Sequence, residues 1–353
     1  MEPSYPGSRN IIREALRLGQ IPESAYEICL ASVRSSTLKQ YNSGLKAWWI
    51  FCTTSKISLF SPSIPNVLKF LCIHFEKGAS YGTLNSYRSA IAQVLGPSIA
   101  QDFRVKRFFQ GVYQLRPSKP KYTNTWGPSI VLNFVKKLNN DHITLEYLTY
   151  KLAILLALTT GQRVQTLSLI DTKNIFQSEK GVEIKITDKI KTSGKNAFQP
   201  ILTLPFYKED ISVCVATTLI CYLGRTKVFR SNDVKYSKLL LTFKKPIHNA
   251  TAQTISRWIK KLMKESGVDI TKFTPHTTRH ASTSAAFKKG ITFDTIRSAA
   301  GWSANSKTFA VFYNRPIKNL SSFAQAVLEY TEFLSIKCIF LIYNIFFIQY
   351  RFK

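Results

Sequence analysis

A short stretch near the C-terminal end limits what this chain can fold into more than any other part of its sequence. It begins with Pro-His-Thr-Thr-Arg-His at 275–280, continues to Gly-Trp at 301–302 and reaches Phe-Tyr-Asn-Arg-Pro at 312–316. His276 and Arg279 stand three apart at a predicted helix start, so their side chains fall on one face of the helix. The fold must therefore present an imidazole and a guanidinium together, with an indole and a phenol following closely in sequence.

These residue types suit the binding and cleavage of a phosphodiester. Arginine offers a planar fork of donors that matches phosphate oxygens, and a second arginine, Arg163, follows Thr-Gly-Gln at 160–162. The phenol of Tyr313 offers an oxygen nucleophile that can form a covalent intermediate. Trp302 has one N–H donor and cannot accept a proton, so it can bind phosphate or buttress the site but cannot act as a base.

In this order, the residues resemble the active site of the tyrosine recombinases, the phage integrase family. The resemblance spans residues 30–330, and the local sequence of these motifs is most similar to that of recombinases of DIRS-like and related eukaryotic mobile elements. It implies a site-specific recombinase or integrase that cleaves and rejoins DNA through a 3′-phosphotyrosyl intermediate, without metal, ATP or another cofactor, to integrate or excise a mobile element. The implied catalytic residues are Arg163, Lys191, His276, Arg279, Trp302 and Tyr313.

The resemblance also implies a role for each group. Tyr313 is the nucleophile, the two arginines clamp the non-bridging oxygens, and His276 donates to the phosphate or takes the tyrosine proton. A lysine on a hairpin protonates the leaving oxygen. Lys191 in Lys-Thr-Ser best matches the family's hairpin, with Lys189 and Lys195 as rivals in the same turn.

Two positions beside these groups are assigned supporting roles. His280 follows His276 by four residues, but no third ligand is evident, so we expect a hydrogen-bonding role and no metal. Thr166 stands where family members usually carry an acidic residue, which puts the orientation of Arg163 or His280 in question. The interval from Trp302 to the tyrosine is also longer than in most bacterial members.

Charge points to a polyanionic partner. The chain carries 49 Lys and Arg against 20 Asp and Glu, a formal net charge of +29. Such an excess favours double-stranded DNA through attraction and counterion release. The 6 cysteines form no Cys-x-x-Cys pair, which indicates reduced thiols in an intracellular protein, and the resemblance places that protein in the nucleus. We expect a homotetramer on DNA.

Periodicity and turn residues divide the chain. A leader covers residues 1–30, and four amphipathic helical patterns over 31–115 predict an all-α DNA-binding domain. Residues 116–128 hold three prolines and a glycine and read as a linker. Residues 129–330 would form the catalytic domain, and 331–353 are a hydrophobic tail of uncertain role.

The predicted fold class is mainly α with a small β-sheet. The resemblance makes the first domain a core-binding (SAM-like) domain and the second an α+β tyrosine recombinase catalytic domain. The apolar run Leu152–Leu158 predicts a buried helix ending at Gly161, and 182–186 with 199–204 predict two strands around a turn. The candidate DNA-contacting residues are Lys39, Lys46, Arg88, Arg104, Lys106, Arg107, Lys119 and Lys121.

Three other interpretations stay open from the sequence. The first is a catalytically silent DNA-binding protein domesticated from a mobile element, which would need only the basic surface. The second is a type IB topoisomerase, which uses similar chemistry but is disfavoured by the compact N-terminal helical region. The third is a membrane-anchored protein resting on the apolar stretch 334–350, which Lys337, Asn344 and Gln349 interrupt. We expect no stable membrane association.

Overall fold

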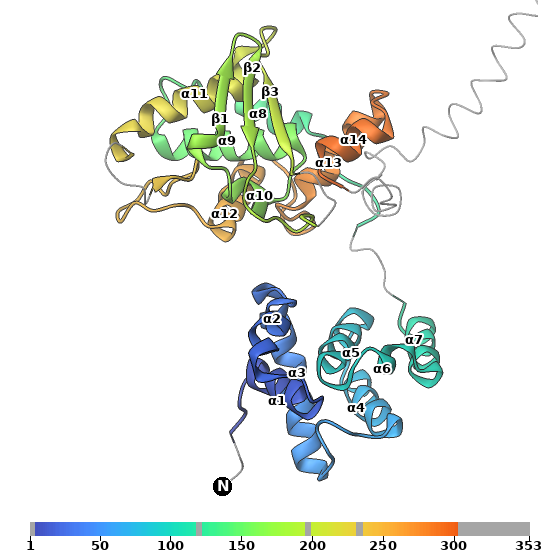
Figure 1. Cartoon of the computed structure of the whole chain (residues 1–353). Coiled ribbons are helices and arrows are strands. Elements are labelled where there is room, and N and C mark those ends of the chain that lie inside the picture. The colour runs from blue at the N-terminus through green and yellow to red at the C-terminus, as the bar shows by residue number, and fades with distance from the viewer. Residues whose placement is uncertain (1–3, 118–121, 195–198, 231–235, 303–353) are drawn as a thin grey trace, which may run out of the picture. The chain divides into compact units, whose positions relative to one another are not determined.

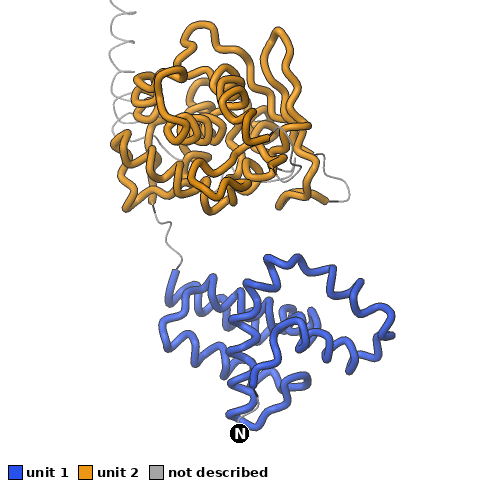
Figure 2. The backbone as a smooth tube through the Cα atoms, turned by 90° about the vertical axis from the view of Figure 1, so that its left-hand side faces the viewer, with its two compact units in different colours: residues 1–120 blue, residues 121–353 orange. Residues whose placement is uncertain are grey.

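The computed structural model describes residues 4–117, 122–194, 199–230 and 236–302 (Figure 1). The chain divides into two compact units, residues 1–120 and 121–353 (Figure 2). Several sequence-based assignments lie outside the described residues: Lys119, Lys121, Lys195, Tyr313 and the tail 331–353.

The first unit is all helical where it is described. Its α-helices are α1 (Ser8–Leu18), α2 (Tyr26–Ala31), α3 (Ser35–Ser55), α4 (Ile64–Glu76), α5 (Tyr81–Leu95), α6 (Ser98–Gln101) and α7 (Phe103–Leu115). Side-chain caps fix two of the starts: Ser80 accepts from the amide of Thr83, and Asp102 accepts from the amide of Arg104. Trp48 is fully buried and meets Phe70 edge-to-face at 5.2 Å between ring centroids, at the centre of this unit's core.

The leader packs within this unit. Ile12 of α1 and Leu30 of α2 are buried in one cluster with Leu45 of α3 and Ala90 of α5. Four helices thus close a second small core beside the one around Trp48. Residues 8–31 therefore belong structurally to the helical unit that follows them.

The second unit is built around one buried helix. Its α-helices are α8 (Ser129–Lys136), α9 (Leu145–Thr160), α10 (Val164–Ser168), α11 (Val215–Thr226), α12 (Ala252–Glu265), α13 (Thr277–Lys288) and α14 (Phe293–Ala299). α9 contacts α11, α12 and α13, and every residue from Leu148 to Leu158 is buried. Thr144 caps its start, and Gly161 ends it with a left-handed φ of +58° that a side chain would disfavour.

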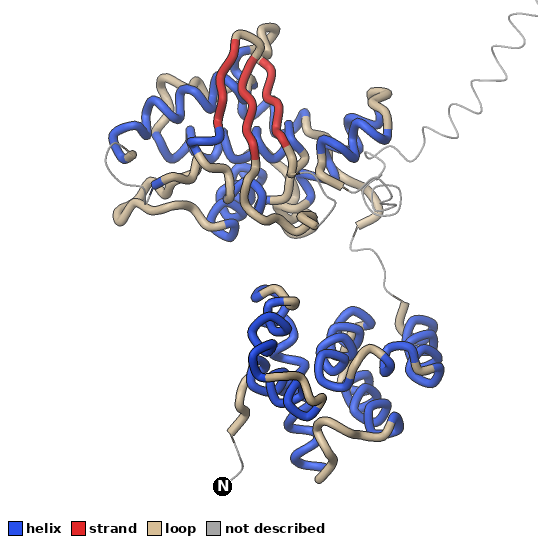
Figure 3. The backbone as a smooth tube through the Cα atoms, in the orientation of Figure 1, coloured by secondary structure: helices blue, strands red, loops and turns tan. Residues whose placement is uncertain are grey.

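A small antiparallel sheet completes the second unit (Figure 3). Its order is β1 (Ile175–Ser178), β2 (Gly181–Lys185) and β3 (Ile201–Pro205), with Ile184 of β2 opposite Ile175 and Leu202. Alternate residues of β2 and β3 are buried against the helices, as a half-buried sheet requires.

The predicted fold class, mainly α with a small β-sheet, is confirmed. The two expected strands correspond to β2 and β3, whereas β1 was not expected. Three of its four residues are exposed, so it lacks the apolar alternation that marks a strand in sequence. Within the described residues, no helix is both long and apolar enough to span a bilayer.

Candidate active site

Arg279 is almost completely buried in the second unit. It lies in the first turn of α13 and is 1% exposed. Its Nη1 donates to the carbonyl of Gly161 at 2.6 Å, and its guanidinium carbon lies 4.1 Å from the ring centroid of Trp302. One side of the guanidinium is therefore fixed to the end of α9 and its face is stacked on an indole.

The start of α13 is itself fixed to the core. Thr277 is fully buried, and its hydroxyl accepts a hydrogen bond of 2.9 Å from the indole N–H of Trp126. His276 occupies the N-cap position immediately before it. The motif that the sequence singled out is thus attached to the second unit through a residue 151 positions away, Trp126.

Gln162 joins the segment of the first arginine to the turn before Trp302. It is 2% exposed, and its Nε2 donates to the carbonyl of Ala299 at 2.8 Å. Gly301 adopts φ +65°, and a Cβ there would lie 3.3 Å from the same Nε2. The next residue, Arg163, is half-buried at the N-cap of α10. Sequence reasoning missed Gln162 because a polar residue inside Thr-Gly-Gln-Arg carries no burial signal of its own.

Three cationic groups act on the pKa of His276. Its pKa is lowered from the ordinary value of 6.5, mainly by burial and then by the positive charges of Arg279, Arg163 and Lys191. These three cations stand on three different local segments, the starts of α13 and α10 and the turn before β3, yet all act on one imidazole. A neutral ring at neutral pH can accept a proton, whereas an imidazolium cannot.

Lys191 lies on the turn between β2 and β3. The turn is closed by two hydrogen bonds, from the amide of Ser193 to the carbonyl of Ile190 at 3.1 Å and from the amide of Ile190 to the Ser193 hydroxyl at 2.9 Å. Ile190 is 3% exposed and anchors the turn, while Lys191 is exposed. Lys189 is exposed as well, but it is not among the charges that lower the pKa of His276.

The supporting positions are also in the second unit. The ring of His280 meets those of His276 and Tyr122 edge-to-face at 5.8 and 5.5 Å. Thr166 is buried in α10, and its amide donates to the carbonyl of Arg163 at 2.8 Å. Among the described residues, no group of three His, Cys, Asp or Glu side chains could hold a metal ion.

The candidate DNA contacts of the first unit differ in their surroundings. Lys39, Lys46, Lys106 and Arg107 are exposed on α3 and α7. Arg88 instead lies 4.5 Å from the ring of Phe109, and Arg104 forms an ion pair with Asp102. The guanidinium groups of Arg88 and Arg104 therefore each have an intramolecular partner, although Arg104 remains exposed.

Solved structures share this fold. The chain aligns with XerH site-specific recombinase bound to palindromic difH substrate in a post-cleavage complex (TM-score 0.55, 15% identity, 92% of this chain and 88% of that chain). It aligns with the Tn1549 transposon integrase in complex with transposon right end DNA (TM-score 0.53, 17% identity, 92% and 99%). A lambda integrase dimer bound to a COC′ core site also aligns (TM-score 0.51, 16% identity, 86% and 75%).

Sequence comparison gives the family directly. No curated protein sequence matches the chain. The model of the phage integrase family matches residues 131–319, which are 189 of the 353 residues and include every predicted catalytic position. The matched stretch is thus more than half of the chain, and the chain belongs to the phage integrase family.

Proposed function

We propose that this protein is a DNA recombinase that cleaves and rejoins strands through a covalent bond to Tyr313. The observation that carries the proposal is the buried guanidinium of Arg279, fixed between the Gly161 carbonyl and the Trp302 ring. A cation held this rigidly beside further cations suits a phosphate whose negative charge grows in the transition state. Tyr313, the nucleophile of this proposal, falls within the stretch that the family model matches and lies outside the described residues.

The reaction is balanced without another reagent. The Tyr313 oxygen forms a bond to phosphorus, and the bond from phosphorus to O5′ breaks. The tyrosine proton passes to His276, whose pKa is lowered by burial and neighbouring cations, and the Lys191 ammonium gives a proton to O5′. The product is a 3′-phosphotyrosyl link and a free 5′-hydroxyl. Reversal rejoins the strand, so we propose that neither metal nor ATP is needed.

The biological setting is part of the proposal. Double-stranded DNA is the partner that the net charge of +29 favours. Exchange of every strand in a pair of duplexes calls for a homotetramer assembled on DNA. The local sequence around Arg163 and Tyr313 supports an origin in a DIRS-like or related eukaryotic element. In this proposal the protein acts in the nucleus to integrate or excise that element.

Covalent trapping tests the proposal. DNA from the flanks of the gene, nicked so that the cleaved fragment diffuses away, would be incubated with the wild type and with Tyr313→Phe. We expect a covalent adduct with the wild type and a loss of at least ~10³-fold in the variant, because only the nucleophilic oxygen is removed. The position of the adduct would be read by nuclease digestion and peptide mass analysis.

The control is DNA affinity. Tyr313→Phe should bind the same DNA with unchanged affinity and the same steep salt dependence. If the wild type binds DNA that contains the element's ends but forms no adduct, the recombinase proposal is wrong. The protein would then be a catalytically silent DNA-binding protein.

A further inference from the structure

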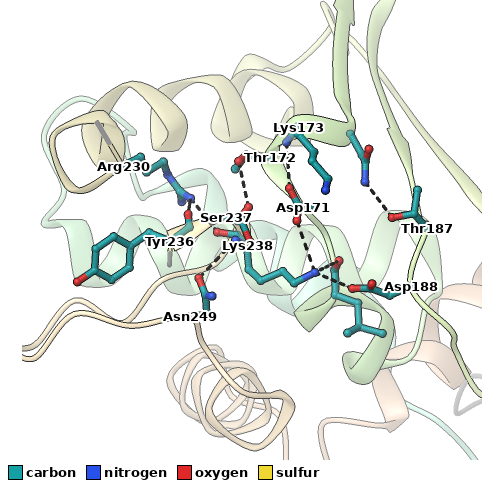
Figure 4. A network of polar contacts seen from close by, with 12 residues as sticks. Asp171, Thr172, Lys173, Thr187, Asp188, Arg230, Tyr236, Ser237, Lys238 and Asn249 are labelled. Carbon is teal, nitrogen blue, oxygen red and sulfur yellow. Dashed lines mark hydrogen bonds and ion pairs between the residues drawn. The ribbon is translucent and has the colours of Figure 1, made fainter. Parts of the chain in front are cut away.

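The ammonium of Lys238 makes three polar contacts that join separate segments of the second unit (Figure 4). Its Nζ lies 2.6 Å from the Asp188 carboxylate and 3.6 Å from that of Asp171, and it donates to the carbonyl of Leu169 at 3.3 Å. The Lys238 side chain is only 22% exposed. We call Lys238, Asp188 and Asp171 the lysine brace.

The segment that carries Lys238 is itself firmly placed. The Leu239 amide donates to the carbonyl of Ile170, and the Thr172 amide donates to the carbonyl of Ser237, each at 2.8 Å. The guanidinium of Arg230 donates to carbonyls of the same segment, including that of Lys238 at 2.8 Å. The ammonium therefore projects from an immobilised backbone, as a positioning group must.

One residue of the lysine brace, Asp188, lies on the turn that carries Lys191, the proposed general acid. Asp188 stands three residues before Lys191, and its carbonyl accepts from Gln199 Nε2 at 3.4 Å. Gln199 also accepts from the Ser193 hydroxyl at 3.1 Å. The Asp188 side chain is 44% exposed and is paired with Lys238.

The other end of the brace is the segment that follows Arg163. That arginine begins α10, and Leu169 and Asp171 come immediately after the helix. Asp171 is buried and caps the next turn by accepting from the amide of Lys173 at 3.2 Å. The brace thus ties the turn of Lys191 to the element that presents the first arginine.

We infer that Lys238 is a positioning residue for proton donation: it holds the Lys191 turn in register with Arg163 through Asp188 and Asp171. This inference rests on the proposed function. Lys238 does not touch the DNA in this account; it acts through Lys191. Because a small misplacement of a catalytic group costs about 10²-fold in rate, loss of the brace should slow cleavage without removing any reacting group.

A change of leaving group tests this role. In one substrate, sulfur replaces O5′ at the cleaved phosphate; thiols have a pKa of about 8.5, so a thiolate leaves without being protonated. A variant whose only defect is misplaced proton donation regains its rate on the sulfur substrate. A variant with a disordered site does not.

We would measure single-turnover cleavage of both substrates by the wild type, Lys191→Ala, Lys238→Met and Asp188→Asn. On the oxygen substrate we expect losses of about 10³-fold for Lys191→Ala, about 10²-fold for Lys238→Met and about 10-fold for Asp188→Asn. On the sulfur substrate all three should come within about 3-fold of the wild type.

Controls separate the possible failures. Lys173→Met removes an exposed positive charge from the same region and should leave both rates unchanged. Lys238→Met leaves the buried Asp171 without its cation and can fail to fold, in which case Asp188→Asn, changed at a half-exposed site, decides. Equal losses on both substrates, or no loss on oxygen, would overturn the role of Lys238. A wild type that forms no Tyr313 adduct would overturn the proposed function and this inference with it.

Discussion

The two halves of the candidate site are built in opposite ways. On the arginine side, Arg279 is 1% exposed and fixed by the Gly161 carbonyl and the Trp302 ring. On the lysine side, Lys191 is exposed on a turn, and what is fixed is the turn beneath it, through Ile190 and the lysine brace.

The difference matches what each chemical task requires. A clamp on non-bridging oxygens gains most from donors that need no reorganisation, and burial in the core provides such rigidity. A proton donor must reach a leaving oxygen that moves during the reaction, so a long side chain on a positioned turn suits it better. Rigidity is therefore placed in the side chain on one side and in the backbone on the other.

The largest expected effect of a conservative change falls on the arginine side. Arg279→Lys keeps the charge but loses the planar fork, and a lysine cannot both reach Gly161 and present parallel donors. We expect cleavage to fall by about 10³-fold, measured as the single-turnover rate. Arg257→Lys, at an exposed position of α12, is the matched control and should retain full activity. A loss smaller than about 10-fold would show that the fixed guanidinium is not what the transition state uses.

A smaller effect is expected at His276, where the two sides meet. Burial and the charges of Arg279, Arg163 and Lys191 lower its pKa below 6.5. A base works only when neutral, so cleavage should persist as pH falls through 6.5 and be lost only below it. We expect His276→Gln to cleave about 10²-fold more slowly and to lack this acid limb. An acid limb that survives in the variant would assign the base to another group.

The helical framework was largely predictable from sequence, because burial leaves a pattern. The run Leu152–Leu158 followed by Gly161 predicts a buried helix that ends at Gly161, and α9 has both features. The turn around Lys191 was also expected, since Lys-Thr-Ser-Gly lies between two alternating segments. Local periodicity and turn chemistry sufficed in these places.

Contacts between distant segments were not predictable. Lys238 and Asp188 are 50 residues apart, and Gln162 and Ala299 are 137 apart. Neither pair has a local signal, because a polar residue in an irregular segment looks the same in sequence whether it is buried or solvated. The pairing of Arg104 with Asp102, by contrast, is local, because the two residues stand two apart at the start of α7.

The division of labour between the two sides is the central claim, and a pair of modified substrates tests it most directly. One carries sulfur in place of O5′, which removes the need for a general acid. The other carries a methyl group in place of a charged non-bridging oxygen, which reduces the need for an arginine clamp. Both would be cleaved in single turnovers by Arg279→Ala and Lys191→Ala.

The account predicts a crossed pattern. Sulfur should rescue Lys191→Ala but not Arg279→Ala, and the methyl group should rescue Arg279→Ala but not Lys191→Ala, each by about 10²-fold or more. Two results would contradict the assignment of separate tasks to Arg279 and Lys191. One is that a single modified substrate rescues both variants, and the other is that no modified substrate rescues any variant.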